Sequence, residues 1–131
     1  MKIVLFICVE NSFRSQIAEA YFNRHAPNDW TATSAGITPA QQVHPNAILL
    51  MKEEGIDISH KKPQLITPEL QLNADIAIIV CSGKLCPVAY AKHIEDWNMP
   101  DPAPMPLDEA RKIRDTIKQK VLKLIENLPK A

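Results

Sequence analysis

Residues 2–25 read KIVLFICVENSFRSQIAEAYFNRH, an apolar run followed by a short polar segment and then an amphipathic one. The run Lys2–Cys8 shows no alternation of apolar and polar residues, which is typical of a strand buried on both faces. Residues 15–25 predict a helix, because apolar side chains gather on one side at Ile17, Ala18, Tyr21 and Phe22. A strand that enters a helix through a short polar loop is the first half of a β-α-β unit.

The rest of the chain continues this alternation of strands and helices. Short apolar runs predict strands over Trp30–Ser34, Ala74–Val80 and His93–Glu95. Capping residues and apolar spacing predict helices over Pro45–Glu54, from Thr67 onward, and over Asp108–Leu128. We therefore expect an α/β fold: one three-layer domain over residues 1–131, with a small parallel sheet of about four strands and helices on both faces.

Composition excludes several classes of protein. The chain has 131 residues, and 15 basic residues balance 15 acidic ones, so no nucleic-acid or polybasic membrane surface is expected. No apolar run approaches the roughly 20 residues of a membrane span, and no small-residue cleavage site follows the first strand. We expect a cytoplasmic monomer.

The chain holds three cysteines, Cys8, Cys81 and Cys86. An odd number this small cannot form a disulfide framework, so each thiol is either an inert core residue or chemically active. Cys8 and Cys81 each end a predicted buried strand. The carboxyl ends of parallel strands meet at one edge of a sheet, where ligands bind, so we expect both thiols at that edge.

The segment Cys8–Ser15 has the form Cys, five residues, Arg, Ser between a strand and a helix. Such a loop can curl its N–H groups around a tetrahedral oxyanion, and the helix adds its positive end. Arg14 can grip two oxygens, and Ser15 can donate to Cys8, which should be a nucleophilic thiolate at neutral pH. Asn11 tolerates the left-handed backbone of a tight loop. The predicted oxyanion-binding residues are Val9, Glu10, Asn11, Ser12, Phe13 and Arg14. The alternative is an ordinary turn with a buried cysteine.

Residues 4–23, VLFICVENSFRSQIAEAYFN, resemble the active-site loop and first helix of the low-molecular-weight protein tyrosine phosphatase superfamily. That superfamily includes the thioredoxin-coupled arsenate reductases. The resemblance extends over nearly the whole chain, with matching elements at Thr33–Gly36, Glu54–Asp57, Glu95–Trp97 and Asp101–Ala103. Two loop residues depart from it. Glu10 stands where many members have Gly, so its side chain should point away from the anion, and Phe13 replaces a second cysteine.

Asp101 is followed by Pro102 in the loop Trp97–Pro106, which carries four prolines. An Asp-Pro pair alone is more often turn chemistry. The superfamily carries its general acid in such an element before the C-terminal helix, so the resemblance implies that Asp101 is that acid. The two tyrosines that follow it in tyrosine phosphatases are replaced by Ala103 and Pro104, which removes a stacking partner for a phosphotyrosine ring.

The resemblance further implies a thiol relay that reduces arsenate to arsenite. Cys8 would attack arsenate held by Arg14, Asp101 would protonate the departing oxygen, and Cys81 would attack Cys8 and expel arsenite. Cys86 would then move the disulfide to Cys81–Cys86, where an external thiol donor such as thioredoxin reduces it. No bound cofactor is expected.

The sequence leaves other interpretations of these residues open. A phosphatase would use Cys8 through a phosphocysteine, with Asp101 as general acid, and would ignore the other cysteines. A non-catalytic oxyanion-binding module is a third function. Cys81 could be a core residue, the cysteine pair a protective redox switch, or the pair could bind zinc with His60 or His93.

Some reductases of this group bind a monovalent cation beside the loop. Asn11, Glu19 and Ser34 match such positions, but Gln64 stands where an acidic ligand is expected. We therefore predict no firm metal site.

Overall fold

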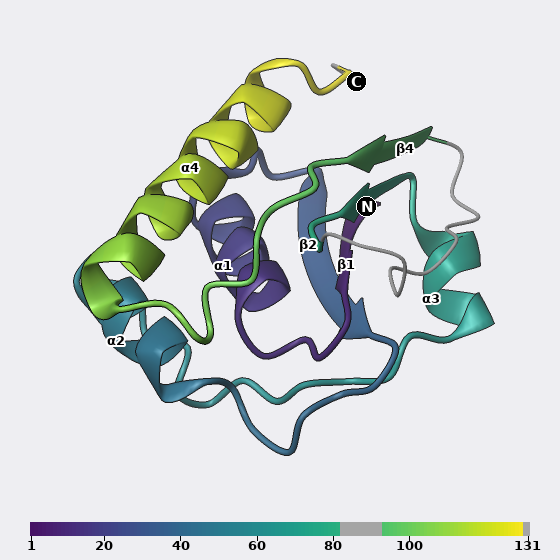
Figure 1. Cartoon of the computed structure of the whole chain (residues 1–131). Helices are drawn as coiled ribbons and strands as arrows, with labels where there is room; N and C mark the ends of the chain where they lie inside the picture. The colour runs from purple at the N-terminus through teal and green to yellow at the C-terminus, as the bar shows by residue number, and fades with distance from the viewer. Residues whose placement is uncertain (82–92, 130–131) are drawn as a thin grey trace.

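A computed structural model of the chain describes residues 1–81 and 93–129 (Figure 1). The elements in chain order are β1 (Lys2–Cys8), α1 (Arg14–His25), β2 (Trp30–Gly36), α2 (Pro45–Lys52), α3 (Pro68–Asn73), β3 (Ile76–Ile79), β4 (His93–Asp96) and α4 (Leu107–Glu126). The described strands form one parallel sheet in the order β2-β1-β3-β4. The predicted α/β class and parallel sheet are confirmed.

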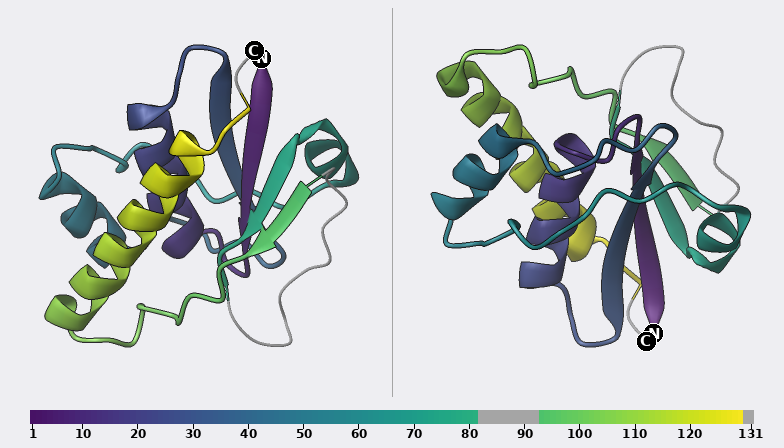
Figure 2. Two further views of the ribbon diagram at one scale, coloured as in Figure 1. Left: turned by 90° about the horizontal axis from the view of Figure 1, so that it is seen from above. Right: turned by 90° about the horizontal axis from the view of Figure 1, so that it is seen from below.

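Helices cover both faces of the sheet. Figure 2 shows α1, α2 and α4 on one face and α3 on the other. Successive side chains of a strand point to opposite faces, and β1 supplies both layers of core. Val4 and Phe6 belong to the larger apolar cluster under α1 and α4, whereas Leu5 and Ile7 belong to a smaller cluster under α3. All four side chains are fully buried, which explains the unbroken apolar run.

Element ends differ slightly from those predicted. Thr67 caps α3 as expected, because its hydroxyl accepts a 3.2 Å hydrogen bond from the Leu70 amide. The α2 helix ends at Lys52 rather than Glu54, since the Glu54 and Gly55 amides bond carbonyls only three residues back. Gly55 then takes a positive φ of 74°, which leaves the helical path. Among the described residues, no helix has the length and apolar character needed to cross a membrane.

Candidate active site

Cys8 ends β1 as a free, buried thiol with two polar contacts. Its Sγ accepts a hydrogen bond from the Asn11 amide at 3.1 Å and lies 2.8 Å from Ser15 Oγ. Ser15 Oγ itself accepts a 2.7 Å bond from Asn11 Nδ2, so its own proton is free to point at the sulfur. Two donors thus converge on Cys8 Sγ and stabilise negative charge there.

Asn11 holds the centre of the loop. Its φ of 53° is left-handed, which confirms the predicted backbone conformation. Its side-chain Oδ1 accepts bonds from the Gln64 amide at 2.9 Å and from Gln16 Nε2 at 3.2 Å. Both bonds require oxygen at that position, so Nδ2 must face Ser15. The sequence did not predict these roles of Gln16 and Gln64. The one signal for Gln16 was its position, as a polar residue beside the apolar stripe of the first helix.

The carbonyls of the loop are turned outward, toward the segment that follows β2. The carbonyls of Cys8, Val9, Glu10 and Ser12 accept hydrogen bonds of 2.9–3.3 Å from the amides of Ile37, Thr38, Ala40 and His44. Within a planar trans peptide the N–H points opposite to the C=O. The next amide in each of these peptides therefore faces the opposite side of the loop, where the Asn11 amide contacts Cys8 Sγ. This side can accept an anion.

Gly36, at the end of β2, allows the loop to lie against the sheet. A Cβ at this position would lie 2.5 Å from the Val9 carbonyl oxygen and 2.9 Å from the Asn11 amide nitrogen. Both atoms belong to backbone and cannot rotate away. The glycine of the Thr33–Gly36 element is therefore required by close packing against the loop that follows Cys8.

Three further loop residues have distinct surroundings. Arg14, which begins α1, is buried, and its Nη1 donates a 2.8 Å bond to the Met99 carbonyl. Phe13 is also buried and lies against the ring of His44, with 5.1 Å between the centroids. Phe13 therefore packs in the core. The side chain of Glu10 is exposed, as its charge led us to predict.

Asp101 lies in the irregular segment between β4 and α4. Its carboxylate is exposed, and Oδ1 accepts a 3.0 Å bond from the Ala103 amide across Pro102, which is a local turn contact. The same segment is tied to the site two residues earlier, where the Met99 carbonyl meets Arg14. The Met99 amide in turn donates to the Val80 carbonyl after β3.

Cys81 lies two residues beyond the end of β3 and is fully buried. Ile7 of β1 pairs with Ile79 of β3, and the Val80 amide donates a 2.8 Å bond to the Ile7 carbonyl. Cys8 and Cys81 therefore leave the sheet at the same edge from neighbouring strands. Cys86 lies outside the described residues.

The candidate cation ligands have protein partners in this structure. Glu19 is buried, accepts a 3.0 Å bond from Ser34 Oγ, and forms an ion pair with Lys61, with 2.5 Å between Nζ and Oε2. Asn11 directs its Oδ1 to Gln16 and Gln64. Within residues 1–81 and 93–129, no group of three or more His, Cys, Asp or Glu side chains could hold a metal ion.

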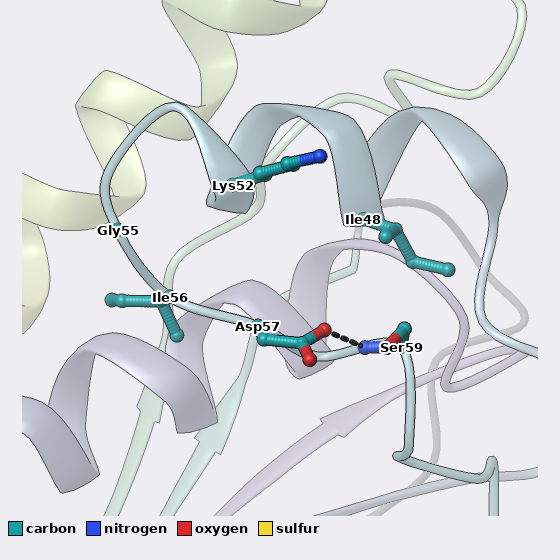
Figure 3. Close-up of a pocket in the computed structure, with 6 residues that line it drawn as sticks. All are labelled: Ile48, Lys52, Gly55, Ile56, Asp57 and Ser59. Carbon is teal, nitrogen blue, oxygen red and sulfur yellow. Dashed lines mark hydrogen bonds between the residues drawn. The ribbon is translucent and has the colours of Figure 1, made fainter.

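A hollow of about 490 Å³ lies away from this loop, beside α2. Figure 3 shows its lining residues, which are Ile48, Lys52, Gly55, Ile56, Asp57 and Ser59. Hydrogen bonds from Ser59 lower the pKa of Asp57 and hold its carboxylate along the wall. None of the lining residues belongs to Cys8–Ser15, so this hollow is separate from the loop that carries Cys8.

Comparison with known proteins agrees with this geometry. Residues 3–131 match the family described as low molecular weight phosphotyrosine protein phosphatase. An arsenate reductase of Brevibacillus brevis is 37% identical over 129 residues, which is 95% of each chain. The structure of a thioredoxin-dependent arsenate reductase of Corynebacterium glutamicum superposes with a TM-score of 0.80 at 32% identity, covering 96% of this chain and 61% of that one. A low molecular weight protein tyrosine phosphatase from T. tengcongensis superposes with a TM-score of 0.85 at 29% identity, covering 98% and 100%.

Proposed function

The chain belongs to the low molecular weight phosphotyrosine protein phosphatase family, and within it we propose that this protein is an arsenate reductase. The observation that carries the proposal is the placement of two cysteines. Cys8 ends β1, and Cys81 follows the neighbouring parallel strand β3 at the same edge of the sheet. A phosphatase needs only the first thiol, whereas reduction of arsenate needs two thiols to supply two electrons.

The first step is attack of the Cys8 thiolate on arsenate. The inward amides of the loop and the guanidinium of Arg14 bind the oxyanion, and the positive end of α1 adds to the attraction. A sulfur–arsenic bond forms while one arsenic–oxygen bond breaks. Asp101 donates a proton to the departing hydroxide, which leaves as water. Ser15 and the Asn11 amide support the charge on the sulfur before attack.

The second step reduces arsenic. The Cys81 thiolate attacks the Cys8 sulfur, a disulfide forms, and the sulfur–arsenic bond breaks with its electron pair left on arsenic, which departs as arsenite. Cys86 then attacks the Cys81 sulfur, which transfers the disulfide and releases the Cys8 thiolate. Each disulfide requires its two Cα atoms within about 7 Å, so Cys81 must approach each partner in turn.

The electrons come from an external dithiol, with thioredoxin as the proposed donor. The support is the similarity to a thioredoxin-dependent arsenate reductase. No bound cofactor takes part in this scheme, because the three thiols and the donor account for both electrons. The proposal includes a single domain over residues 1–131 that acts as a cytoplasmic monomer.

A phosphatase is the second candidate, favoured by the phosphatase relative and by the tie between the Arg14 loop and the segment of Asp101. Arsenate and phosphate share shape and charge, so the anion-binding loop serves both. A phosphocysteine on Cys8 would form and then be hydrolysed by water that Asp101 activates. Cys81 and Cys86 would take no part.

The deciding experiment is arsenate-dependent oxidation of NADPH in the presence of thioredoxin and thioredoxin reductase. The wild-type protein should consume NADPH, and Cys81→Ser should consume none while keeping its fold by circular dichroism. Cys8→Ser serves as the control that stops both candidate reactions. No NADPH oxidation, together with equal hydrolysis of p-nitrophenyl phosphate by the wild type and Cys81→Ser, would identify a phosphatase.

A further inference from the structure

Glu19 is a carboxylate with a side chain only 6% exposed, on the face of α1 that packs against β2. Burial of a charge this deep is costly unless an opposite charge and hydrogen bonds compensate it. The Lys61 ammonium supplies the opposite charge, 2.5 Å from Oε2, and Ser34 Oγ donates to Oε1 at 3.0 Å. Lys61 is itself 35% exposed and reaches inward from the segment between α2 and α3.

The segment that carries Lys61 also reaches the nucleophile. Gln64, three residues later, donates its amide N–H to Asn11 Oδ1 at 2.9 Å. Its side chain donates to the Ser34 carbonyl at 2.8 Å, and its carbonyl accepts from the Gly36 amide at 2.9 Å. Residues 61–64 are therefore fastened at one end by Lys61 to α1 and at the other by Gln64 to β2 and Asn11.

Asn11 transmits this placement to Cys8. With Oδ1 held by Gln64, Asn11 Nδ2 must point to Ser15 Oγ, at 2.7 Å, and Ser15 Oγ lies 2.8 Å from Cys8 Sγ. Gln16 Nε2 also donates to Asn11 Oδ1, at 3.2 Å, so two bonds hold the amide. A segment freed at Lys61 would weaken the shorter of the two, the Gln64 bond, and leave the Asn11 amide less firmly held. The Ser15 hydroxyl would then be directed less precisely at the Cys8 sulfur.

We propose that Lys61 is a positioning residue for Cys8, and that its ammonium acts as a built-in monovalent cation for the Glu19–Ser34 oxygens. The protein then needs no dissolved cation at this place. The effect on arsenate turnover rests on the proposed function, but the effect on the Cys8 thiol does not. Removal of the ammonium leaves carboxylate and hydroxyl oxygens that a small cation of the same charge can occupy.

The test uses Lys61→Ala in a Cys81→Ser/Cys86→Ser background, in which Cys8 is the one remaining cysteine of the three. Lys62→Ala is the matched control, because Lys62 is the exposed neighbour. The rate of Cys8 alkylation by iodoacetamide is measured across pH in chloride salts of tetramethylammonium, potassium and ammonium at equal ionic strength. Tetramethylammonium is too large for the site that the Lys61 side chain leaves.

In tetramethylammonium chloride, Cys8 of Lys61→Ala should be alkylated about threefold to thirtyfold more slowly than Cys8 of the control, and the pH profile of this rate should change. Potassium or ammonium should restore most of the rate and raise the melting temperature of Lys61→Ala alone, because they bind its folded state. Equal rates for Lys61→Ala and Lys62→Ala would overturn the positioning role. A slow rate that neither cation restores would overturn the role as a built-in cation.

A second variant covers the case in which Lys61→Ala does not fold. Glu19→Gln/Lys61→Met removes both charges with little change of volume. Proteins often tolerate such a replacement of a buried ion pair by uncharged side chains. This variant should fold, its Cys8 should be alkylated slowly, and the rate should not respond to potassium. A rate equal to that of the control contradicts the proposal.

Arsenate-dependent NADPH oxidation is then measured with all three cysteines present. If the unsubstituted protein reduces no arsenate, the proposed function fails while the alkylation data still decide the role of Lys61.

Discussion

Arg14 Nη1 donates a 2.8 Å hydrogen bond to the carbonyl of Met99, a residue 85 positions later in the chain. The bond joins the loop after β1 to the segment before α4, two residues from Asp101. The guanidinium is buried, so this contact sets its direction. One side chain thus joins the loop that carries Cys8 to the segment of the proposed acid.

Replacement of Arg14 by Lys should weaken oxyanion binding strongly while leaving the protein folded. An ammonium carries its three donors on one nitrogen and lacks the planar fork that grips two oxygens while a further N–H bonds Met99. Hydrogen bonds to charged groups are worth roughly 1.5–3 kcal/mol each. Protection of Cys8 from iodoacetamide by inorganic phosphate measures the binding. Arg24→Lys is the control, because Arg24 is exposed and makes a bond of only 3.4 Å to Gly55. Equal protection in the two variants would refute the role of Arg14.

Replacement of Ser15 by Ala should slow the reaction of Cys8. The substitution removes the hydroxyl 2.8 Å from Sγ and leaves Asn11 Nδ2 without its acceptor. The loss of a bond to a charged group predicts a rate lower by about tenfold to a hundredfold. Iodoacetamide alkylation at neutral pH checks it, with the exposed Ser59→Ala as control. An unchanged rate would mean that the Asn11 amide alone supports the thiolate.

Two glycine substitutions should destabilise the folded protein by different amounts. In Gly36→Ala, the new Cβ meets backbone atoms of Val9 and Asn11 at 2.5 and 2.9 Å, so the loop after Cys8 must move. In Gly55→Ala, the nearest atom lies 3.9 Å away and only the positive φ is unfavourable, at roughly 1–2 kcal/mol. Urea unfolding should show the larger loss of stability for Gly36→Ala, accompanied by loss of phosphate protection at Cys8. The opposite order of stability would show that the loop can shift freely.

Protonation of Glu53 in acid should lower the stability of the folded protein. Hydrogen bonds from Arg111 and Arg114 lower the pKa of Glu53 from 4.5 to about 2. A lowered pKa in the folded state stabilises the protein above the unfolded pKa, and this contribution is lost as the pH falls from about 4.5 to 2.

Urea unfolding of the wild type and Glu53→Gln from pH 6 to 2 measures this contribution. The difference between the two proteins should be largest at pH 6 and shrink toward pH 2. Glu126→Gln, on the exposed last turn of α4, should show no such trend. A difference that stays constant with pH would mean that the charge of Glu53 does not stabilise the fold.

Local patterns were enough to predict the elements and the loop that carries Cys8. The unbroken apolar run of β1 requires helices on both faces of the sheet, and the polar segment between Cys8 and Ser15 can only be a loop at the sheet edge. Thr67 as a cap and Asn11 as a left-handed residue also follow from local chemistry, and the structure has both. These properties depend on residues within a few positions of each other, which a sequence displays directly.

Contacts between distant segments could not be read in this way. The bond of Arg14 to Met99, the bond of Gln64 to Asn11 and the ion pair of Lys61 with Glu19 each join separate elements. Lys61 and Gln64 look like ordinary polar residues of a surface segment, and only packing of that segment against α1 and β2 gives them partners. The sequence by itself determined the β-loop-α unit and its thiol, because spacing and hydropathy act locally. Tertiary structure decided which side chains orient that thiol, because those contacts form only when the chain closes on itself.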